Sequence, residues 1–227
     1  MNTINVLIAE DHAIVREGFC SLLKREHDIT VVGQAENGRL AVQMAAQLKP
    51  DVIVMDIAMP LLNGIEATRQ ILHHEPTAKI LILSAHSDDV YVQQIMTLGA
   101  YGYLIKQSTA HALADAIRRV HAGKKYFSPI VSKRLAHHRE KAKALGELAP
   151  KEGADKLTSR ETEVLQLISE GKANKESAEE LHISVKTVEK HRQSLMDKLN
   201  IHDTAGLTRY SIATGIIESS VQVTIVE

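Results

Sequence analysis

Residues 52–60 read Val-Ile-Val-Met-Asp-Ile-Ala-Met-Pro, an apolar run that ends on Asp56. A short continuous apolar run is typical of a strand that is buried on both faces, as in parallel sheets. The first half of the chain contains four further runs of strand length, Ile4–Ala9, Ile29–Val32, Ile80–Leu83 and Tyr101–Ile105. Between these runs lie helical patterns near residues 13–25, 38–48, 64–74, 88–98 and 109–122. The alternation predicts an α/β fold, a doubly wound parallel sheet of five strands with helices on both faces.

The sequence after Leu157 has helical patterns only. Thr158 and Glu161 form a capping box for a first helix, and Ser184 and Asp203 are suited to cap two later ones. The expected helices are Ser159–Glu170, Lys175–Leu181, Val185–Leu199 and Thr204–Thr214. We therefore expect an α/β domain over residues 1–122, a linker over 123–156 that can form one helix (Val131–Leu145), and an all-α, four-helix domain over 157–227.

The composition excludes several classes of protein. Apolar residues make up 44% and charged residues 24% of the chain, a balance typical of globular proteins. The single cysteine, Cys20, excludes an internal disulfide framework. No apolar run approaches the roughly 20 residues that span a bilayer, and residues 1–9 lack the features of a signal peptide. We expect a soluble cytoplasmic protein with no membrane partner. The C-terminal domain carries more acidic than basic side chains, so any contact with nucleic acid has to depend on local charge.

Polar residues stand at the ends of four predicted strands. They are Glu10 and Asp11 after the first, Asp56 at the end of the third, Ser84 after the fourth and Lys106 after the fifth. Because parallel strands with right-handed crossovers end at the same edge of a sheet, we expect these side chains to meet there. Any one of them alone is normally a solvated strand-end residue, so only the joint pattern indicates a site.

Three carboxylates at one edge repel one another unless a cation offsets their charge. Mg²⁺ suits this set because it is a hard ion that prefers oxygen ligands. Asp56 can then attack a phosphoryl donor and form an acyl phosphate. Lys106 and the ion would stabilise the charge that develops, and Ser84 can donate a hydrogen bond to a phosphoryl oxygen.

Residues 1–122 resemble the receiver domain of bacterial two-component response regulators, which has a flavodoxin-like sheet. The matching residues are Glu10-Asp11, Met55-Asp56-Ile57-Ala58-Met59-Pro60, Gly64, Ser84-Ala85 and Gly102-Tyr103-Leu104-Ile105-Lys106. The resemblance implies that Asp56 accepts phosphate from a sensor histidine kinase. It also implies that Mg²⁺ is bound by Glu10, Asp11, Asp56 and the backbone carbonyl of Ala58.

The same resemblance implies that Ser84 and Tyr103 rearrange together. The Ser84 hydroxyl moves towards the phosphoryl group and leaves space that Tyr103 fills; the alternative is that Tyr103 is a plain strand aromatic. Glu10 and Gln107 stand where many receivers have Asp and Pro. His86 has two interpretations: it tunes dephosphorylation by contacting the attacking water, or it is an exposed loop histidine.

Residues 157–201 resemble the LuxR-type helix-turn-helix. The matching residues are Leu157-Thr158-Ser159-Arg160-Glu161, Glu163-Val164-Leu165, Gly171, Asn174-Lys175-Glu176, Ala178, Leu181, Ile183-Ser184, Thr187-Val188, His191 and Lys198-Leu199. With the receiver, this identifies the chain as a member of the NarL/FixJ family of response regulators. The resemblance implies a transcription regulator that binds double-stranded DNA as a homodimer when phosphorylated, with Thr204–Thr214 as the dimerisation helix.

Val185–Leu199 is the expected recognition helix, whose N-terminal half enters the major groove. One face carries Val185, Val188, Leu195 and Leu199, which should pack on the other helices. The expected DNA contacts are Lys186 and Lys190 to phosphate or guanine, Glu189 to cytosine, Gln193 to adenine, and Thr187 and Arg192 to phosphates. The alternative is a solvated charged face. Ser177 departs from the family pattern, which has an apolar residue there; its hydroxyl can bond the carbonyl four residues earlier.

Two other functions compete with this interpretation. A phosphatase with an Asp nucleophile needs a second acid two residues further on to protonate the leaving group, but position 58 is Ala. A receiver-bearing interaction protein would use its C-terminal helices to bind protein or RNA. We expect a phosphorylation-controlled transcription regulator rather than an enzyme, one that promotes only its own Mg²⁺-dependent phosphorylation and dephosphorylation.

Overall fold

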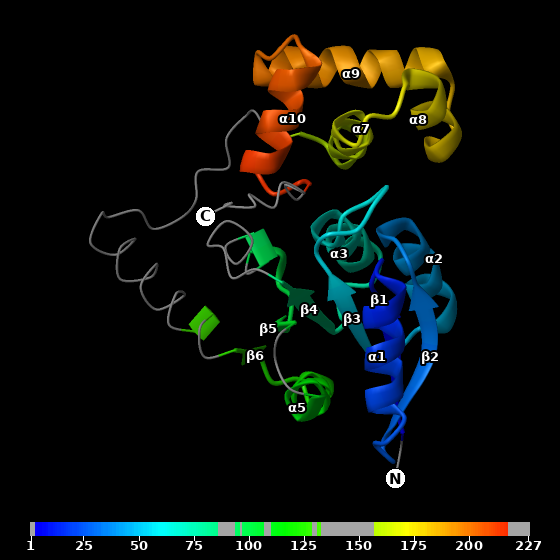
Figure 1. Cartoon of the computed structure of the whole chain (residues 1–227), viewed down its shortest axis with the longest axis vertical. Coiled ribbons are helices and arrows are strands. Elements are labelled where there is room, and N and C mark those ends of the chain that lie inside the picture. The colour runs from blue at the N-terminus through cyan, green and yellow to red at the C-terminus, as the bar shows by residue number, and fades with distance from the viewer. Residues whose placement is uncertain are drawn as a thin grey trace, which may run out of the picture. The chain divides into compact units, whose positions relative to one another are not determined.

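A computed structural model (Figure 1) describes residues 3–85, 94–95, 97–106, 110–128, 131–132 and 157–217. The chain divides into two compact units, Met1–Glu152 and Gly153–Glu227. The N-terminal unit is an α/β sheet and the C-terminal unit is helical, which confirms the predicted fold class. No helix within the described ranges has both the length and the apolar character needed to cross a membrane.

The sheet of the N-terminal unit is parallel throughout. Its strands are β1 (Ile4–Ala9), β2 (Ile29–Ala35), β3 (Val52–Asp56), β4 (Ile80–Ser84), β5 (Gly102–Ile105) and β6 (Tyr126–Phe127). They lie in the order β2-β1-β3-β4-β5-β6. The prediction of five strands was wrong by one, because β6 has only two residues and is too short to show a strand pattern. The first residues of the segment predicted as a linker therefore extend the sheet beside β5.

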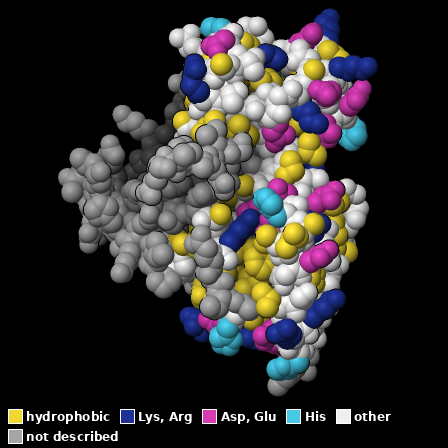
Figure 2. All heavy atoms as spheres, viewed as in Figure 1, with side chains coloured by type: hydrophobic (Ala, Val, Ile, Leu, Met, Phe, Trp, Pro, Cys, Tyr) yellow, Lys and Arg dark blue, Asp and Glu magenta, His cyan; other side chains and the backbone are white. Residues whose placement is uncertain are grey.

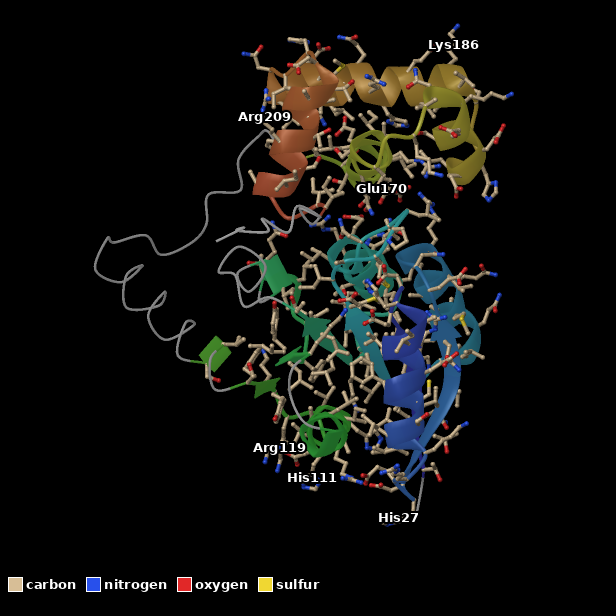
Figure 3. The ribbon with its side chains drawn as sticks, viewed as in Figure 1. His27, His111, Arg119, Glu170, Lys186 and Arg209 are labelled. Atoms are coloured by element: carbon tan, nitrogen blue, oxygen red, sulfur yellow. The ribbon has the colours of Figure 1, made fainter. Side chains whose placement is uncertain are left out.

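Helices cover both faces of this sheet, as Figure 1 shows. One face packs on α1 (Ala13–Leu23) and α5 (Ala110–His121), the other on α2 (Gly38–Leu48) and α3 (Gly64–His74). In β3, Val52 and Val54 belong to the first core and Ile53 and Met55 to the second. Since both faces of β3 are buried, every residue of this strand is apolar until Asp56. In Figure 3, His111 and Arg119 lie on the outer side of α5.

Some predicted elements fall on residues that the structure does not describe. In the helix predicted at residues 88–98, only 94, 95, 97 and 98 are described, and all four are helical. In the helix predicted at Val131–Leu145, only residues 131 and 132 are described, also as helix. Residues 148–156, the tail after residue 217, His86 and Gln107 lie outside the described residues.

The C-terminal unit consists of α7 (Ser159–Ser169), α8 (Asn174–Leu181), α9 (Val185–Leu199) and α10 (Thr204–Ala213). The predicted caps are confirmed: Thr158 and Glu161 form a capping box, and the side chains of Ser184 and Asp203 accept from Thr187 N and Gly206 N. In Figure 1, α9 runs across α7, with α8 at its N-terminal end and α10 at its C-terminal end.

The core of this unit confirms most of the predicted inner face of α9. Val188 and Leu195 are fully buried and Leu199 is half-buried. Val185 is the exception on that face, because its side chain is 39% exposed in the first turn of the helix. In α9, therefore, two buried anchors about two turns apart fix the helix on the unit and leave its opposite face open to solvent.

Candidate functional site

The register of the sheet brings four strand ends together. Ala9 of β1 pairs with Met55, Asp56 pairs with Leu83, and Ser84 pairs with Ile105. The polar residue at each of these strand ends therefore lies within one residue, in register, of the polar residue on the neighbouring strand. The backbone continues the pairing past the strands, because Lys106 N donates to Ser84 O at 2.8 Å. The predicted clustering of Glu10, Asp56, Ser84 and Lys106 thus follows directly from parallel topology.

Lys106 occupies the centre of this edge. Its Nζ lies 2.8 Å from Glu10 Oε2 and 2.8 Å from Asp56 Oδ2. The two carboxylates are 0% and 1% exposed, while the Lys106 side chain is 16% exposed. A buried cation between two buried carboxylates is compensated electrostatically, but only one positive charge faces two negative ones here.

Burial among these charges raises the pKa of Asp56 to about 7. Burial is the main cause, and the neighbouring Glu10 and Asp11 act in the same direction, whereas Lys106 opposes them. Burial also lowers the pKa of Lys106, but the attraction of Asp56 and Glu10 outweighs it, so the pKa lies above its ordinary value. Lys106 is therefore a permanent cation, and Asp56 is a carboxylate that needs further positive charge to stay ionised.

Two residues of this site escaped the sequence reasoning. His12 Nδ1 lies 2.8 Å from Asp11 Oδ1 and 3.1 Å from Glu10 Oε1, and the charge of Asp11 is the main cause that raises the pKa of His12. Arg16, in the first turns of α1, donates from Nη1 to the carbonyl oxygens of Glu10 and Asp11. Their positions in the sequence could have indicated both residues, because His12 follows the two acids directly and Arg16 stands one helical turn further on.

The donor set fits a divalent cation. Among the described residues, the buried oxygens Glu10 Oε2 and Asp56 Oδ2 form ion pairs with the single cation Lys106, and Asp11 Oδ1 pairs with His12. Atoms of Glu10, Asp11 and His12 that are able to bind a metal lie within 4.8 Å of one another. Buried carboxylates that outnumber their cations are costly unless a further cation approaches them. Oxygen ligands of this kind suit a hard divalent cation such as Mg²⁺.

Gly64 shapes the loop that follows Asp56. Its N–H donates to Ile57 O at 2.9 Å, and a Cβ at this position would overlap the carbonyl oxygen of Asp56. Asn63 caps α3 next to it by accepting from Glu66 N at 2.9 Å. Only glycine permits α3 to begin this close to the end of β3, so Gly64 fixes the backbone on which Asp56 stands.

Ser84 and Tyr103 lie on neighbouring strands inside the same unit. Ser84 is 1% exposed, and Tyr103 is fully buried in the core on the side of α2 and α3. Tyr103 is also tied to the sixth strand, since Phe127 is its register partner and Ser128 N donates to Tyr103 O at 3.0 Å. The side chain that the family resemblance assigns to the switch thus occupies an inward position, and its movement with Ser84 stays a prediction.

In α9, four of the six predicted DNA contacts are exposed. These are Lys186, Glu189, Lys190 and Gln193. Figure 3 shows Lys186 at the start of α9, pointing away from the other helices. Gln193 Nε2 donates to Asp197 Oδ1 at 2.8 Å, a bond on the helix surface that DNA can replace. Thr187 is half-buried, with its hydroxyl 2.8 Å from that of Ser184 at the helix cap.

Arg192 has a different setting from the other five. Its Nη1 donates to Asn174 Oδ1 at 3.2 Å, and its Nη2 donates to Thr204 Oγ1 at 3.0 Å. The guanidinium thereby connects the first residues of α8 and α10 to α9. A phosphate contact from Arg192, as predicted, requires donors that these two bonds do not use.

Buried polar contacts also fix α9 on α7. Glu161 is 4% exposed and accepts hydrogen bonds from Ser194 Oγ and Lys198 Nζ, both at 2.7 Å. Burial raises the pKa of Glu161, but the bonds from Lys198, the Thr158 backbone and Ser194 outweigh it and hold the pKa at about 2. The capping residue of α7 therefore also anchors the recognition helix.

Ser177 corrects one expectation. Its side chain is fully buried, as predicted for a position that is apolar in the family, but its Oγ has no hydrogen-bond partner among the described residues. The expected bond to the carbonyl of Ala173 is absent; only the backbone N–H of Ser177 donates there, at 2.9 Å. The hydroxyl is therefore buried at a cost of about 1–3 kcal/mol.

The surface of the C-terminal unit carries both signs of charge. On the side of this unit that Figure 2 shows, basic and acidic side chains are interspersed. Pairs such as Arg160 with Glu163 at 2.6 Å contribute to the mixture. As the sequence predicted, any attraction for nucleic acid depends on the local placement of a few lysines on α9.

Comparison with known proteins decides the family. Residues 6–118 match the response regulator receiver domain, and residues 155–211 match the bacterial regulatory proteins of the luxR family. This chain is a response regulator of the NarL/FixJ family. The response regulator is 41% identical over 212 residues to the transcriptional regulatory protein LiaR of Bacillus subtilis, covering 92% of this chain and 96% of LiaR. It is 37% identical over 227 residues to the transcriptional regulatory protein DegU of Brevibacillus brevis, covering 96% of both chains.

Solved structures of related proteins agree with this assignment. RcsB of Salmonella typhimurium is 30% identical, and the match covers 94% of this response regulator and 100% of RcsB with a TM-score of 0.56. RcsB from Salmonella enterica serovar Typhimurium has also been solved bound to promoter rprA in the presence of the phosphomimetic BeF₃⁻; it is 29% identical, with a TM-score of 0.55 and coverage of 92% and 98%. The chain is therefore a transcription regulator of a two-component system, which confirms the predicted function class.

Proposed function

We propose that this response regulator accepts a phosphoryl group on Asp56 from a sensor histidine kinase. The observation that carries this proposal is the contact of Lys106 Nζ with two buried carboxylates, those of Asp56 and Glu10. This places a fixed cation next to the nucleophile, where it neutralises charge on an incoming phosphoryl group. In the transfer, an Asp56 carboxylate oxygen forms a bond to phosphorus while the P–N bond of the kinase phosphohistidine breaks.

The residues that would hold a divalent cation, which we infer to be Mg²⁺, are Glu10, Asp11, Asp56 and the backbone carbonyl of Ala58. When bound, the ion would supply positive charge that keeps Asp56 ionised and offsets the charge on phosphoryl oxygens. Lys106 binds and orients a phosphoryl oxygen from the side of β5, and Ser84 donates its hydroxyl to another. The same residues, by admitting water to the acyl phosphate, set the rate of dephosphorylation.

The phosphoryl group changes the protein through Ser84 and Tyr103. As Ser84 turns towards the phosphoryl group, the inward position of Tyr103 becomes the favoured one, so phosphorylation shifts an existing equilibrium. The burial of Tyr103 supports this proposal, because it shows that the core can hold the side chain in the inward position. Phosphorylation then favours a dimer that binds DNA, with α10 as its interface.

The DNA-bound dimer reads two half-sites about one helical turn apart. Lys186 and Lys190 contact phosphate or guanine, Glu189 accepts from cytosine, and Gln193 pairs with adenine. Thr187, at the cap of α9, and Arg192 contact phosphates. A regulator that reads chromosomal DNA in a bacterium works in the cytoplasm, where we expect this one.

Selection of bound genomic fragments, with and without a small acyl phosphate as phosphodonor, tests this proposal. We expect recovery of a defined set of sites that increases with the phosphodonor, and no increase for Asp56→Asn. Lys190→Ala should weaken binding to those sites, while Lys124→Ala, at an exposed lysine just beyond α5 in the N-terminal unit, should not. A phosphodonor effect that persists in Asp56→Asn contradicts the proposed phosphoacceptor, and selection of RNA or protein but not DNA contradicts the proposed target.

A further inference from the structure

Arg16 makes a contact that the function proposed above does not use. It lies in the first turns of α1, and its Nη1 donates to Glu10 O at 2.6 Å and to Asp11 O at 3.3 Å. One guanidinium nitrogen thus contacts both carbonyl oxygens of the acidic pair. These carbonyls belong to Glu10 and Asp11, the two residues whose side chains we propose as cation ligands.

The position of Arg16 is unfavourable for the helix itself. A cation near the N-terminus of a helix opposes the helix dipole, typically by about 0.3–1 kcal/mol. Helix α1 has no acidic residue in its first turn, and its N-cap, His12, makes no capping hydrogen bond from its side chain. The contact with the two carbonyls is therefore the interaction that offsets this position, since a charged donor to carbonyl oxygen makes a strong hydrogen bond.

The strand end needs such a restraint. Glu10 N is held by Ala35 O of β2 at 2.9 Å, but the chain then leaves the sheet to start α1. Glu10 has to keep its carboxylate buried against Lys106, whereas Asp11, one residue on, is partly exposed beside His12. Because the direction of a side chain follows from its backbone, a restraint on both carbonyls sets where both carboxylates point.

We propose that Arg16 is a positioning residue that holds the Glu10 and Asp11 backbone in the geometry that binds a divalent cation. This inference rests on the proposed phosphoacceptor function and adds a residue that touches neither the cation nor the phosphoryl group. Loss of the guanidinium lets the turn at residues 10–11 relax, so the acidic pair binds the cation more weakly. Removal of a group that orients metal ligands typically costs about tenfold or more in metal affinity.

The test is the affinity of the full-length protein for Mn²⁺, a paramagnetic substitute for Mg²⁺, measured by electron paramagnetic resonance. We expect Arg16→Met to weaken Mn²⁺ binding about tenfold and Arg16→Lys, which keeps one donor, to restore part of the loss. Arg25→Met, at an exposed arginine just beyond α1, should bind Mn²⁺ as the unaltered protein does. Hydrogen exchange of β1 and α1 shows whether each variant is folded.

Phosphorylation by a small acyl phosphate at increasing Mg²⁺ gives a second readout. The Mg²⁺ concentration for half-maximal rate should rise about tenfold in Arg16→Met, while the rate at saturating Mg²⁺ approaches that of the unaltered protein. A folded Arg16→Met with unchanged Mn²⁺ affinity overturns the inference, and so does a loss of stability without a change in affinity. A different result would contradict the phosphoacceptor proposal. In that case the unaltered protein binds Mn²⁺ but gains no phosphoryl group that depends on Asp56.

Discussion

Lys106 Nζ lies 2.8 Å from Asp56 Oδ2, so the end of β5 delivers a cation directly to the end of β3. These strands are not neighbours in the sheet, because β4 runs between them. The side chain of Lys106 therefore reaches across the end of β4 to contact Asp56, and on to Glu10 of β1 at the same distance. One flexible lysine thereby connects three strands at the proposed phosphoryl site.

Lys106→Met should separate cation binding from phosphorylation. Removal of the lysine leaves the carboxylates less compensated, so a divalent cation should bind at least as tightly as before. Phosphorylation of Asp56 by a small acyl phosphate should slow by about 10²-fold, because one fixed group that stabilises the developing charge is lost. Mn²⁺ titration and mass spectrometry of the intact protein measure the two effects. Equal loss of both would show that Lys106 mainly holds the fold.

The contacts of Glu161 give the C-terminal unit a pH dependence at the acid end. Its folded pKa of about 2 lies below its ordinary value of 4.5. Such a group stabilises the fold fully above pH ~4.5, and the contribution is lost as the pH falls from about 4.5 to about 2. The shift corresponds to at most about 3 kcal/mol. We expect Glu161→Gln to remove this dependence and to destabilise α7 and α9 by about 2 kcal/mol at neutral pH.

Hydrogen exchange of peptides from α7 and α9 between pH 3 and pH 6 measures this effect apart from the stability of the receiver. Glu179→Gln is the matched control, since Glu179 is an exposed residue of the same unit. If amide hydrogen exchange in α9 depends on pH in the same way in Glu161→Gln and Glu179→Gln, Glu161 is not the source of the pH dependence.

Ser177 and Ser211 allow the free energy cost of a buried hydroxyl without a partner to be compared with that of a buried hydroxyl that has one. Both are fully buried in the C-terminal unit, but Ser177 Oγ has no partner among the described residues, while Ser211 Oγ lies 2.7 Å from Ser169 Oγ. We expect Ser177→Ala to stabilise the unit by about 1 kcal/mol and Ser211→Ala to destabilise it by a similar amount. Local hydrogen exchange of α8 and α10 measures the two changes. Destabilisation by Ser177→Ala would reveal a partner for its hydroxyl.

A substitution of Arg192 can show whether this residue contacts DNA or only supports α9. Its bonds to Asn174 and Thr204 predict that Arg192→Met loosens α8 and α10 on α9 and weakens DNA binding. If Arg192 also neutralises a phosphate, the slope of log affinity against log salt concentration falls by about 1; if it only supports α9, the slope is unchanged. Binding titrations at several salt concentrations decide between the two. Lys190→Ala serves as the reference for a lost charge on the outer face.

Local signals in the sequence predicted most of the framework. Apolar runs, interrupted only by Asn5 in β1, marked β1, β3 and β4 because both faces of a parallel sheet are buried, and capping residues marked the starts of α7, α9 and α10. Strand-end polarity, combined with parallel topology, also predicted which side chains meet at the proposed phosphoryl site. Each of these signals lies within a few residues of the element that it marks.

The remaining features depend on what lies nearby in space. The two residues of β6 form a strand only because β5 offers them an open edge. Val185 is 39% exposed although the helical period places it on the same face as the buried Val188. The missing partner of Ser177 and the bonds of Arg192 depend on groups from other helices.

The sequence by itself determined that acids and a lysine stand at strand ends, that the N-terminal unit is α/β, and that a capped helix carries the predicted DNA contacts. Only the tertiary structure decided that Lys106 lies between Asp56 and Glu10, that burial leaves Asp56 in need of more positive charge, and that Arg16 donates to the carbonyls of the acidic pair. The physical reason is range: propensity and periodicity act along the chain, whereas burial, electrostatics and hydrogen bonding to distant carbonyls act through space.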